Sequence, residues 1–373
     1  KPLVEAIILA GGKAERLGDA AGGLPKSLVD IAGKPLAAYQ VGRLVRSGVT
    51  RVIVSCALGQ GALFERELAG LGAEMDRHAA ARTGEIPSGF ASWQNARAIA
   101  AAVSKAPKNA APMTLKDIAS YQAKDRDAVC TTYRVYKLCG MGPPSSGATT
   151  VFQVLGMLER FDMKALGKDD PKAWHLIAEA MLLAYADREK YLGDADFVSV
   201  PVAGLIDKGY IASRSALISE TTSLPSYAAG TPPGAEPRTA ALSSEVAGTT
   251  HFVAADRFGG VATMTSTVEG PFGSQLVANG YVLNNELTDF TFAPTKDGAP
   301  VANRPQPGKR PLSSMSPTLV YDADGKPIFA VGAAGGKTII MQVAKTLIAH
   351  LDWGLGVQAA IAAPNIYFGG EAI

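Results

Sequence analysis

The chain has 373 residues, of which 47% are hydrophobic and 19% charged. A soft prior of about 150 residues per domain suggests two domains or one large one, and this composition excludes a disordered chain. The net charge of +2, from 36 basic and 34 acidic residues, gives no electrostatic footprint for nucleic acid, and three cysteines are too few for a disulfide scaffold.

No stretch of the sequence is expected to cross a membrane. The most apolar stretch near the C-terminus is interrupted by Lys345, His350 and Asp352, whereas a span needs roughly 20 mostly apolar residues. At the N-terminus, Glu5 lies inside an apolar run that ends at the Gly11-Gly12 turn. We therefore expect the first strand of a domain there and no signal peptide in this chain.

The first 75 residues alternate between strand and helix signals. Apolar runs at 4–10 and 50–56 predict two buried strands, and residues 36–47 suit a helix between them. Strand, turn, helix and strand form the βαβ pattern of a parallel sheet. Residues 76–106 are rich in alanine and predict a helix at 95–105.

The glycine turn after the first strand carries residues suited to phosphate. Gly11 and Gly12 let backbone N–H groups approach a phosphate, and Lys13, Arg16 and Lys26 would neutralise it. A lone Gly-Gly pair would predict no more than an ordinary βα turn. Here it is followed by a Pro-Lys pair and by Gly-Lys-Pro-Leu at 33–36.

With these motifs, the first 75 residues resemble the start of a sugar-1-phosphate nucleotidylyltransferase. The resemblance implies nucleotide binding by this loop, with Mg²⁺ held by an aspartate at the end of a further strand. Between residues 57 and 110 the sequence shows no such strand and aspartate. The segment is therefore expected to bind a phosphate without the catalytic half of that fold.

From about residue 107, antiparallel strand signals bounded by helices favour a layered α+β sandwich. Thr114 and Asp117 form a capping-box pattern that opens a short helix, and Asp324-Gly325 is a strong hairpin signal. Residues 219–248 form a long loop rich in Pro, Gly, Ser and Thr. The other predicted elements, in chain order, are strands near 127–131 and 133–139, helices at about 148–160 and 171–190, a strand pair at 251–256 and 260–268, a strand pair at 317–322 and 326–331, and helices at about 336–350 and 354–362.

Several separate motifs in this second region occur in a fixed order. They are residues 143–147 (Pro-Pro-Ser-Ser-Gly), 186–188 (Ala-Asp-Arg), 248–252 (Gly-Thr-Thr-His-Phe), 283–290, 309–317 and 332–336 (Gly-Ala-Ala-Gly-Gly). Together they resemble γ-glutamyltranspeptidase over about residues 107–373. The resemblance implies a layered αββα sandwich of the N-terminal-nucleophile-hydrolase type, preceded here by a small Rossmann-like α/β segment.

The central residue under this resemblance is Thr249, whose hydroxyl is a poor nucleophile until a base lies beside it. An N-terminal threonine supplies its own base, an α-amino group with a pKa of about 8, so the chain must first cut itself between Gly248 and Thr249. The hydroxyl would then attack the γ-glutamyl carbonyl of glutathione or a related amide. The resulting ester would pass the acyl group to water or to an amino-acid or dipeptide acceptor.

The resemblance assigns two further catalytic roles. Thr267 matches a second threonine whose hydroxyl hydrogen-bonds the nucleophile. Gly335 and Gly336 match paired glycines whose N–H groups form an oxyanion hole. Taken singly, the two glycines would be read as a turn at the start of a helix, and Thr249 as a threonine at the start of a strand.

The donor's charged groups are matched by polar residues farther along the chain. Ser313 and Ser314 match a pair that binds the α-carboxylate, and Asp289 matches the carboxylate that binds the α-ammonium. Glu269 and Glu286 stand where many members carry Asn and Gln, and both can still accept a hydrogen bond from the ammonium. Taken singly, the serines would be capping residues and Asp289 a loop carboxylate.

Cys130 and Cys139 lie at facing ends of two adjacent strand-like runs. A disulfide there would close a short loop, add about 2–3 kcal/mol and fit an oxidising compartment such as a periplasm. Two buried free thiols are the alternative, and Cys56 is expected in the core. The four histidines show no metal-ligand spacing, so we expect no metal site and no cofactor, apart from Mg²⁺ under the nucleotidylyltransferase interpretation.

The domain organisation follows from these two resemblances. The large-subunit half of the transpeptidase family that carries an arginine for the donor's α-carboxylate is not recognised, and nucleotidylyltransferase-like sequence stands in its place, as in a composite of two truncated pieces. The expected segments are 1–75 (nucleotidylyltransferase-like), 76–106 (junction), 107–248 (large-subunit-like) and 249–373 (small-subunit-like).

Three hypotheses about function remain open at this point. The first is a γ-glutamyl transferase or hydrolase whose two cleaved fragments stay associated, located in the periplasm or secreted. The second is a nucleotide-binding protein of the nucleotidylyltransferase type, located in the cytoplasm. The third is a composite chain without activity. Small-molecule substrates are expected in the first two cases, and neither nucleic acid nor a membrane is expected as a partner.

Overall fold

The computed structural model describes residues 5–9, 30–31, 34–35, 38, 51–55, 88–241 and 248–367. In the described residues, runs of strands and runs of helices follow one another along the chain, and most strand pairs are antiparallel, which makes this an α+β protein. The chain divides into two compact units, of which the first comprises Lys1–Ala123, Thr250–Met264 and Ser274–Leu283, and the second Lys124–Thr249, Thr265–Gly273 and Asn284–Ile373.

The first unit contains the predicted parallel strand pair. Strand β1 (Glu5–Leu9) runs parallel to β4 (Arg51–Ser55), as the βαβ pattern predicts. The other edge of β1 pairs antiparallel with residues 252–255 of β7 (Thr249–Ala255), a pairing that the sequence pattern did not indicate. Strand β8 (Val261–Thr267) follows β7 in the sheet order β4-β1-β7-β8. Apart from residue 38, the predicted helix at 36–47 lies outside the described residues.

Among the described residues, the rest of the first unit contains two longer helices and short strand pairs. Helix α4 (Ser88–Ser104) begins earlier than the predicted 95–105. Helix α5 (Leu115–Ser120) has the predicted capping box, because Thr114 accepts from the Asp117 N–H and the Asp117 carboxylate accepts from the Thr114 N–H. The short strands are β2 (Asp30–Ile31), β3 (Lys34–Pro35), β9 (Val277–Ala278) and β10 (Tyr281–Val282).

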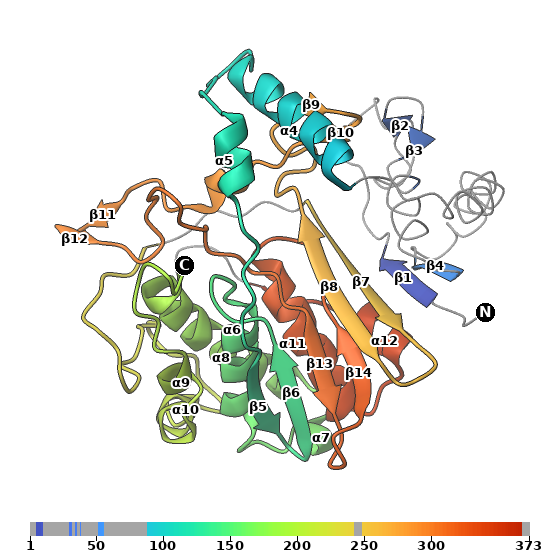
Figure 1. Ribbon diagram of the computed structural model, residues 1–373. Coiled ribbons are helices and arrows are strands. Elements are labelled where there is room, and N and C mark those ends of the chain that lie inside the picture. The colour runs from blue at the N-terminus through green and yellow to red at the C-terminus, as the bar shows by residue number, and fades with distance from the viewer. Residues whose placement is uncertain are drawn as a thin grey trace. The chain divides into compact units, whose positions relative to one another are not determined.

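The second unit is built on an antiparallel sheet with the order β14-β13-β6-β5 (Figure 1). Its strands are β5 (Val129–Tyr133), β6 (Tyr136–Gly140), β13 (Thr318–Tyr321) and β14 (Pro327–Val331). The first two begin two or three residues later than predicted, because the turn between them falls at Arg134 and Val135. Arg134 has φ +54° and is held there by its N–H bond to Glu159 and by Asp352, which lies 2.9 Å from its Nε.

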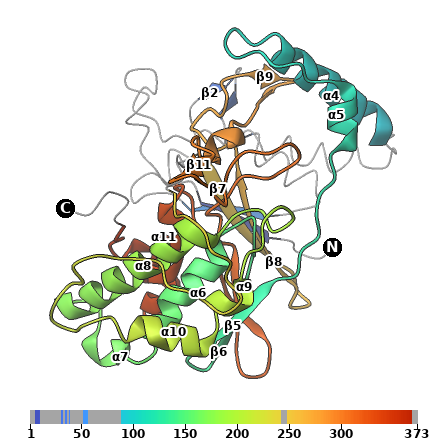
Figure 2. The same cartoon turned by 90° about the vertical axis from the view of Figure 1, so that its left-hand side faces the viewer.

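Helices pack around the buried helix α6 (Gly147–Leu158), in which eleven of the twelve residues are buried. Helices α8 (Pro171–Tyr191), α10 (Lys208–Ser215) and α11 (Thr338–Leu351) all contact it (Figure 2). Asp170 caps α8, whose first residue is proline, so the strong predicted helix at 171–190 is confirmed. The remaining elements of this unit are α7 (Met163–Leu166), α9 (Val202–Leu205), the 3₁₀ helix η4 (Glu286–Asp289), β11 (Thr295–Lys296), β12 (Ala299–Pro300) and α12 (Val357–Ala362).

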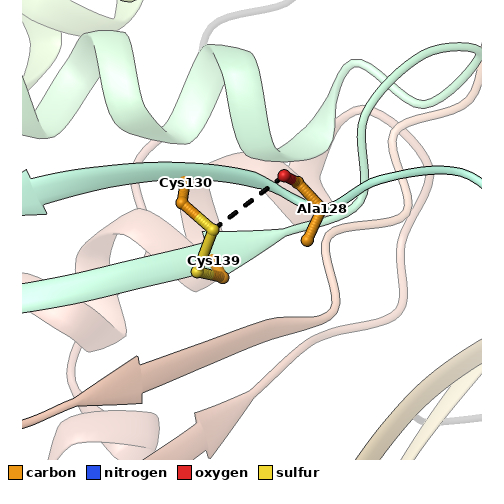
Figure 3. Close-up of a disulfide and its surroundings, with 3 residues drawn as sticks. All are labelled: Ala128, Cys130 and Cys139. Carbon is orange, nitrogen blue, oxygen red and sulfur yellow. Dashed lines mark hydrogen bonds between the residues drawn. A yellow bond between two sulfur atoms is a disulfide. The ribbon is translucent and has the colours of Figure 1, made fainter. Parts of the chain in front are cut away.

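A disulfide joins Cys130 to Cys139 across neighbouring strands β5 and β6 (Figure 3). The two residues are direct partners in the antiparallel register, with their Cα atoms 4.1 Å apart. Of the two alternatives for this pair, the structure has the bonded one. The bond ties the outer strand of the sheet to its neighbour.

None of the helices in the described ranges combines the length and the apolar character that crossing a bilayer requires.

Candidate active site

Thr249 and Thr267 face each other at 3.0 Å, with the Thr249 hydroxyl donating to Oγ1 of Thr267. Thr249 is the first residue of β7 and Thr267 the last of β8. The oxygen of Thr267 also accepts the backbone N–H of Glu269 at 2.8 Å. This second bond fixes the acceptor that receives the Thr249 proton, so the hydroxyl is oriented before any substrate binds.

A small cavity of about 10 Å³ lies directly against this pair, with room for roughly one water molecule. Besides Thr249, six of the residues that line this cavity were predicted from the sequence as site residues. The complete lining is Thr249, Thr267, Glu269, Asp289, Ser313, Ser314, Met315, Gly336 and Ile339. The structure therefore brings to a single place the predicted nucleophile, four of the five residues predicted to bind the donor and one of the two glycines predicted to form an oxyanion hole.

Glu269 reaches this cavity from a strained backbone. It is buried, and its φ of +69° lies in the left-handed region, which costs free energy for a residue with a β-carbon. Asn285 holds it in place, since its side-chain amide donates to the Glu269 carboxylate and its carbonyl oxygen accepts the N–H of Gly270 at 2.8 Å. The carboxylate is thus positioned by a residue that the sequence did not single out.

The backbone of Asp289 is hydrogen-bonded to a buried asparagine, Asn303. The side-chain amide of Asn303 donates to the Asp289 carbonyl at 2.7 Å, and its oxygen accepts the Leu312 N–H at 2.9 Å. One side chain therefore ties the end of η4 to the residue that precedes Ser313. Glu286, the other predicted acidic residue, begins η4 and does not line the cavity.

Ser313 and Ser314 lie on a segment that is hydrogen-bonded to the turn before α6. The backbone N–H and the hydroxyl of Ser146 both donate to the Ser313 carbonyl at 2.7 Å, and Ser145 Oγ donates to the Met315 carbonyl at 2.5 Å. The Ser313 N–H donates to Pro144 at 3.1 Å. The Pro-Pro-Ser-Ser-Gly motif is therefore the support of the serine pair.

Gly335 and Gly336 precede helix α11 in a turn that needs glycine. Their φ angles are +137° and +59°, and a β-carbon on Gly335 would lie 2.4 Å from Thr338 Oγ1. Thr338 closes the turn by donating from its hydroxyl to the Gly335 carbonyl at 2.8 Å. The turn lies at the positive end of the α11 dipole, a position that favours a developing oxyanion.

Gly248, the residue before Thr249, is pressed against another part of the backbone. A β-carbon there would lie 2.1 Å from the Glu269 carbonyl oxygen and 2.2 Å from that of Gly270. Only glycine fits at this position without a shift of the main chain. The peptide bond before Thr249 is therefore held at the edge of the cavity.

His251, two residues after Thr249, is buried, and burial lowers its pKa to about 4. Its Nε2 lies 3.2 Å from the Thr263 hydroxyl. Because the ring is neutral at pH 7, it is a packed, hydrogen-bonded histidine and does not supply a positive charge. In the described part of the chain, no group of three or more His, Cys, Asp or Glu side chains could hold a metal ion.

The predicted nucleotide-binding loop cannot be placed in this way. Gly11, Gly12, Lys13, Arg16 and Lys26 all lie outside the described residues. The site residues that sequence reasoning missed are those that support others. They are Ser146, Arg188, Asn285 and Asn303. The first three belong to motifs that marked the resemblance but received no role, and Asn303 carries no signal in a single sequence.

The comparisons with known proteins agree with both resemblances. A family model described as Gamma-glutamyltranspeptidase matches residues 85–370, and one described as MobA-like NTP transferase domain matches residues 6–134. The start of the chain is thus similar to nucleotidyltransferases, as its glycine loop predicts, and the two matches overlap at 85–134.

Curated relatives cover the second region of the chain. The glutathione hydrolase proenzyme of Bacillus subtilis subsp. natto is 39% identical over 264 residues, which are 68% of this chain and 44% of the relative. That of Escherichia coli (strain K12) is 39% identical over 271 residues, 70% of this chain and 45% of the relative. The chain therefore spans less than half the length of these two relatives.

Among solved structures, cephalosporin acylase from Bacillus halodurans has a similar fold, with a TM-score of 0.60 at 24% identity. The likeness covers 79% of this chain and 49% of that one. At this identity it concerns the fold alone. Because the transpeptidase match extends over most of the sequence, from residue 85 to residue 370, the chain belongs to the γ-glutamyltranspeptidase family.

Proposed function

We propose that this chain is a γ-glutamyl transferase or hydrolase that uses Thr249 as an N-terminal nucleophile. The observation that carries the proposal is the 3.0 Å hydrogen bond from the Thr249 hydroxyl to Thr267, beside a cavity lined by Glu269, Asp289 and the serine pair. A nucleophile, acidic groups for an ammonium and hydroxyls for a carboxylate are what a γ-glutamyl donor requires.

Activation begins with cleavage of the chain. The Thr249 oxygen attacks the Gly248 carbonyl carbon and its proton moves to the departing Thr249 nitrogen, so that the peptide C–N bond breaks and an ester forms. Water then hydrolyses the ester, leaving a carboxylate on Gly248 and restoring the hydroxyl. The new α-amine of Thr249 is a base with a pKa of about 8, which suits proton transfer near neutral pH.

Cleavage also frees space for the substrate. In the intact chain the cavity has room for about one water molecule, and the Gly248 backbone abuts the Glu269 and Gly270 carbonyls. Once the bond is cut, the Gly248 end can leave this position. The site then opens beside the residues proposed for donor binding.

In the transfer reaction the Thr249 hydroxyl attacks the γ-carbonyl of glutathione or a similar amide. The α-ammonium of the donor contacts Glu269 and Asp289, with Glu286 nearby in η4, and the α-carboxylate contacts Ser313 and Ser314. The N–H groups of the Gly335-Gly336 turn stabilise the oxyanion. The amine leaves, and the acyl group passes to water or to an amino-acid or dipeptide acceptor, without a cofactor.

The domain boundaries predicted from the sequence are part of this proposal. Residues 107–248 correspond to a large-subunit-like part and 249–373 to a small-subunit-like part that remain associated after cleavage, preceded by the segment 1–75 and the junction 76–106. The layered αββα arrangement and a periplasmic or secreted location belong to the same proposal. Small molecules are the proposed partners, with neither nucleic acid nor a membrane among them.

The first experiment is the intact mass of freshly purified protein followed over time. The proposal expects two fragments, 1–248 and 249–373, which do not form in Thr249→Ala but do form in the matched control Thr250→Ala. The cleaved protein should then release 4-nitroaniline from γ-glutamyl-4-nitroanilide. A single uncleaved species after long incubation would show that Thr249 is only a strand residue.

A second candidate function rests on the NTP-transferase match at residues 6–134. We propose that the loop of Gly11, Gly12, Lys13, Arg16 and Lys26 binds a nucleotide or sugar phosphate with Mg²⁺, in which case the protein would act in the cytoplasm. Mg²⁺-dependent binding of a nucleoside triphosphate that is lost in Lys26→Ala would support it. If neither cleavage nor nucleotide binding occurs, the chain is an inactive composite.

A further inference from the structure

The turn formed by Gly335 and Gly336 (the oxyanion turn) is held by two side chains of helix α11. The side-chain amide of Gln342 donates to the Ala334 carbonyl at 2.8 Å and to Thr338 Oγ1 at 3.0 Å. The Thr338 hydroxyl in turn donates to the Gly335 carbonyl at 2.8 Å. Thr338 and Gln342 are four positions apart on the helix and therefore share one face.

The directions of these hydrogen bonds admit one arrangement. A carbonyl oxygen only accepts, so the Thr338 hydroxyl proton points at Gly335 and the hydroxyl oxygen accepts from Gln342. The side-chain amide of Gln342 has two N–H protons, and each of them has an acceptor. The network is therefore complete within the protein and needs no group of a substrate.

Each carbonyl that is held in this way determines where the next N–H group points. In a trans peptide unit the C=O group and the following N–H group point in opposite directions, and both peptide bonds are trans here. The bond from Gln342 to the Ala334 carbonyl therefore sets the direction of the Gly335 N–H. The bond from Thr338 to the Gly335 carbonyl sets that of the Gly336 N–H. Gly336 lines the cavity of the candidate site.

Two glycines do not keep such directions by themselves. Glycine populates positive φ about as readily as negative φ, and the two φ angles here are +137° and +59°. The two side chains lie close to the first glycine, since a β-carbon on Gly335 would be 2.4 Å from Thr338 Oγ1 and 2.9 Å from Gln342 Nε2. Hydrogen-bond donors stabilise an oxyanion most when they are oriented before the reaction.

We propose that Gln342 and Thr338 are positioning residues that orient the two N–H groups of the oxyanion turn toward the oxygen on which charge develops. They act through the carbonyls of Ala334 and Gly335 and not by contact with the substrate. This role rests on the proposed function, because it requires acyl transfer at Thr249. The alternative is that both residues only stabilise the start of α11.

Three small molecules separate the orientation of the turn from the binding of the donor. γ-Glutamyl-4-nitroanilide measures acyl transfer, and L-glutamate, as a competitive inhibitor with the same α-ammonium and α-carboxylate, measures the donor site. 2-Amino-4-boronobutanoic acid carries a boronic acid in place of the γ-amide. Its boron bonds to the Thr249 oxygen, whose proton passes to the α-amine of Thr249, and becomes a tetrahedral anion that resembles the transition state.

The experiment compares wild type with Thr338→Val, Thr338→Ser and Gln342→Met after each full chain has cleaved itself. In Thr338→Val and Gln342→Met, kcat/KM for the nitroanilide should fall about tenfold or more. The Ki of the boronic acid should rise by the same factor, because a misdirected donor affects only the charged oxygen. The Ki of L-glutamate should stay within about threefold of wild type. Thr338→Ser keeps the hydroxyl and should restore most of the loss.

The matched control is Thr346→Val, on the same helix. The Thr346 hydroxyl donates at 2.7 Å to the main-chain carbonyl of Gln342, which is not part of the oxyanion turn. This variant should keep kcat/KM and both Ki values within about twofold of wild type. If Thr338→Val does not fold, Gln342→Met carries the same test, since the Gln342 side chain is only half-buried.

The outcomes separate this inference from the function on which it rests. The inference is overturned if the Ki of L-glutamate rises as much as that of the boronic acid, or if kcat/KM is unchanged in both Thr338→Val and Gln342→Met. It is also overturned if Thr346→Val shows the same losses, or if it alone among the three cleaves itself. In each of these cases turnover by the wild type would still uphold the proposed function. If the wild type releases no nitroaniline, the proposed function fails and the positioning role fails with it.

Discussion

The side-chain amide of Asn303 donates to the backbone carbonyl of Asp289 at 2.7 Å, while its oxygen accepts from Leu312. Asn303 is buried, so these are bonds that water cannot replace. The two backbone groups belong to the segments that present Asp289 and Ser313 to the cavity. An amide with one donor end and one acceptor end sets the spacing between the proposed ammonium and carboxylate sites.

Asn303→Asp keeps the acceptor for Leu312 and replaces the donor to Asp289 with an oxygen. We expect the free energy of unfolding in urea to fall by about 1–3 kcal/mol, since a buried carbonyl loses its partner. The KM for a γ-glutamyl donor should rise as the two segments separate. Asn109→Asp, at an exposed position, should change stability by less than about 0.5 kcal/mol. Equal stabilities of the two variants would show that the Asn303 bridge is not needed.

Gly248→Ala adds a β-carbon 2.1 Å from the Glu269 carbonyl oxygen. The main chain must shift to admit it, which moves the carbonyl that Thr249 attacks. We expect cleavage, followed by intact mass, to slow by at least about tenfold, since small misplacements of reacting atoms are costly. The control is Gly356→Ala, where an added β-carbon meets nothing within 4 Å. An unchanged cleavage rate in Gly248→Ala would mean that the backbone near Glu269 can shift to admit the β-carbon without displacing the bond that is cut.

Glu269→Asn relieves backbone strain at a position with φ +69°. Asn enters the left-handed region more readily than Glu, so we expect the free energy of unfolding to rise by up to about 1 kcal/mol. The amide oxygen can still accept from an α-ammonium, and KM for the donor should stay within about threefold of wild type. Glu269→Leu, which has no acceptor, should raise KM much further. If the Glu269→Leu variant has a normal KM for the donor, Glu269 does not bind the donor.

Burial of His251 makes stability depend on pH. Its pKa is about 4 in the folded protein against 6.5 for the free side chain, so between these values the unfolded chain binds a proton that the folded one does not. The free energy of unfolding should therefore decrease as pH falls from 6.5 to 4, by up to about 3 kcal/mol. Urea unfolding at several pH values should show this slope, and His251→Gln should reduce it. An equal slope in the variant would assign it to other groups.

Much of the described fold could be predicted from local sequence signals. The Thr114–Asp117 capping box, the proline-started helix α8 and the hairpin at Gly325 all appear near their predicted places. These features depend on residues close together in the chain. The two-residue turn at Arg134 was missed because nothing local favours a positive φ there, and the contact with Asp352 that stabilises it comes from far along the chain.

The candidate site shows the same division. Residues that would touch the substrate, such as Thr249 and Ser314, could be named because they belong to motifs. The roles of the residues that support them could not be predicted, because the fold determines which group a buried side chain contacts. The bond from Arg188 to Ser314 spans 126 positions, and that from Asn303 to Asp289 lies in a loop without regular periodicity.

Strands β6 and β13 are the central pair in the sheet of the second unit. In the sequence, β6 precedes the peptide bond between Gly248 and Thr249, and β13 follows it. Gly140 pairs with Thr318 and Lys137 with Tyr321, so a cut at 248–249 would leave each fragment with half of one continuous sheet. Unfolding of the cleaved protein would then release two chains, and refolding would become a bimolecular reaction. The refolding rate and the melting midpoint of the cleaved protein would depend on protein concentration, whereas those of the uncleaved Thr249→Ala chain would not.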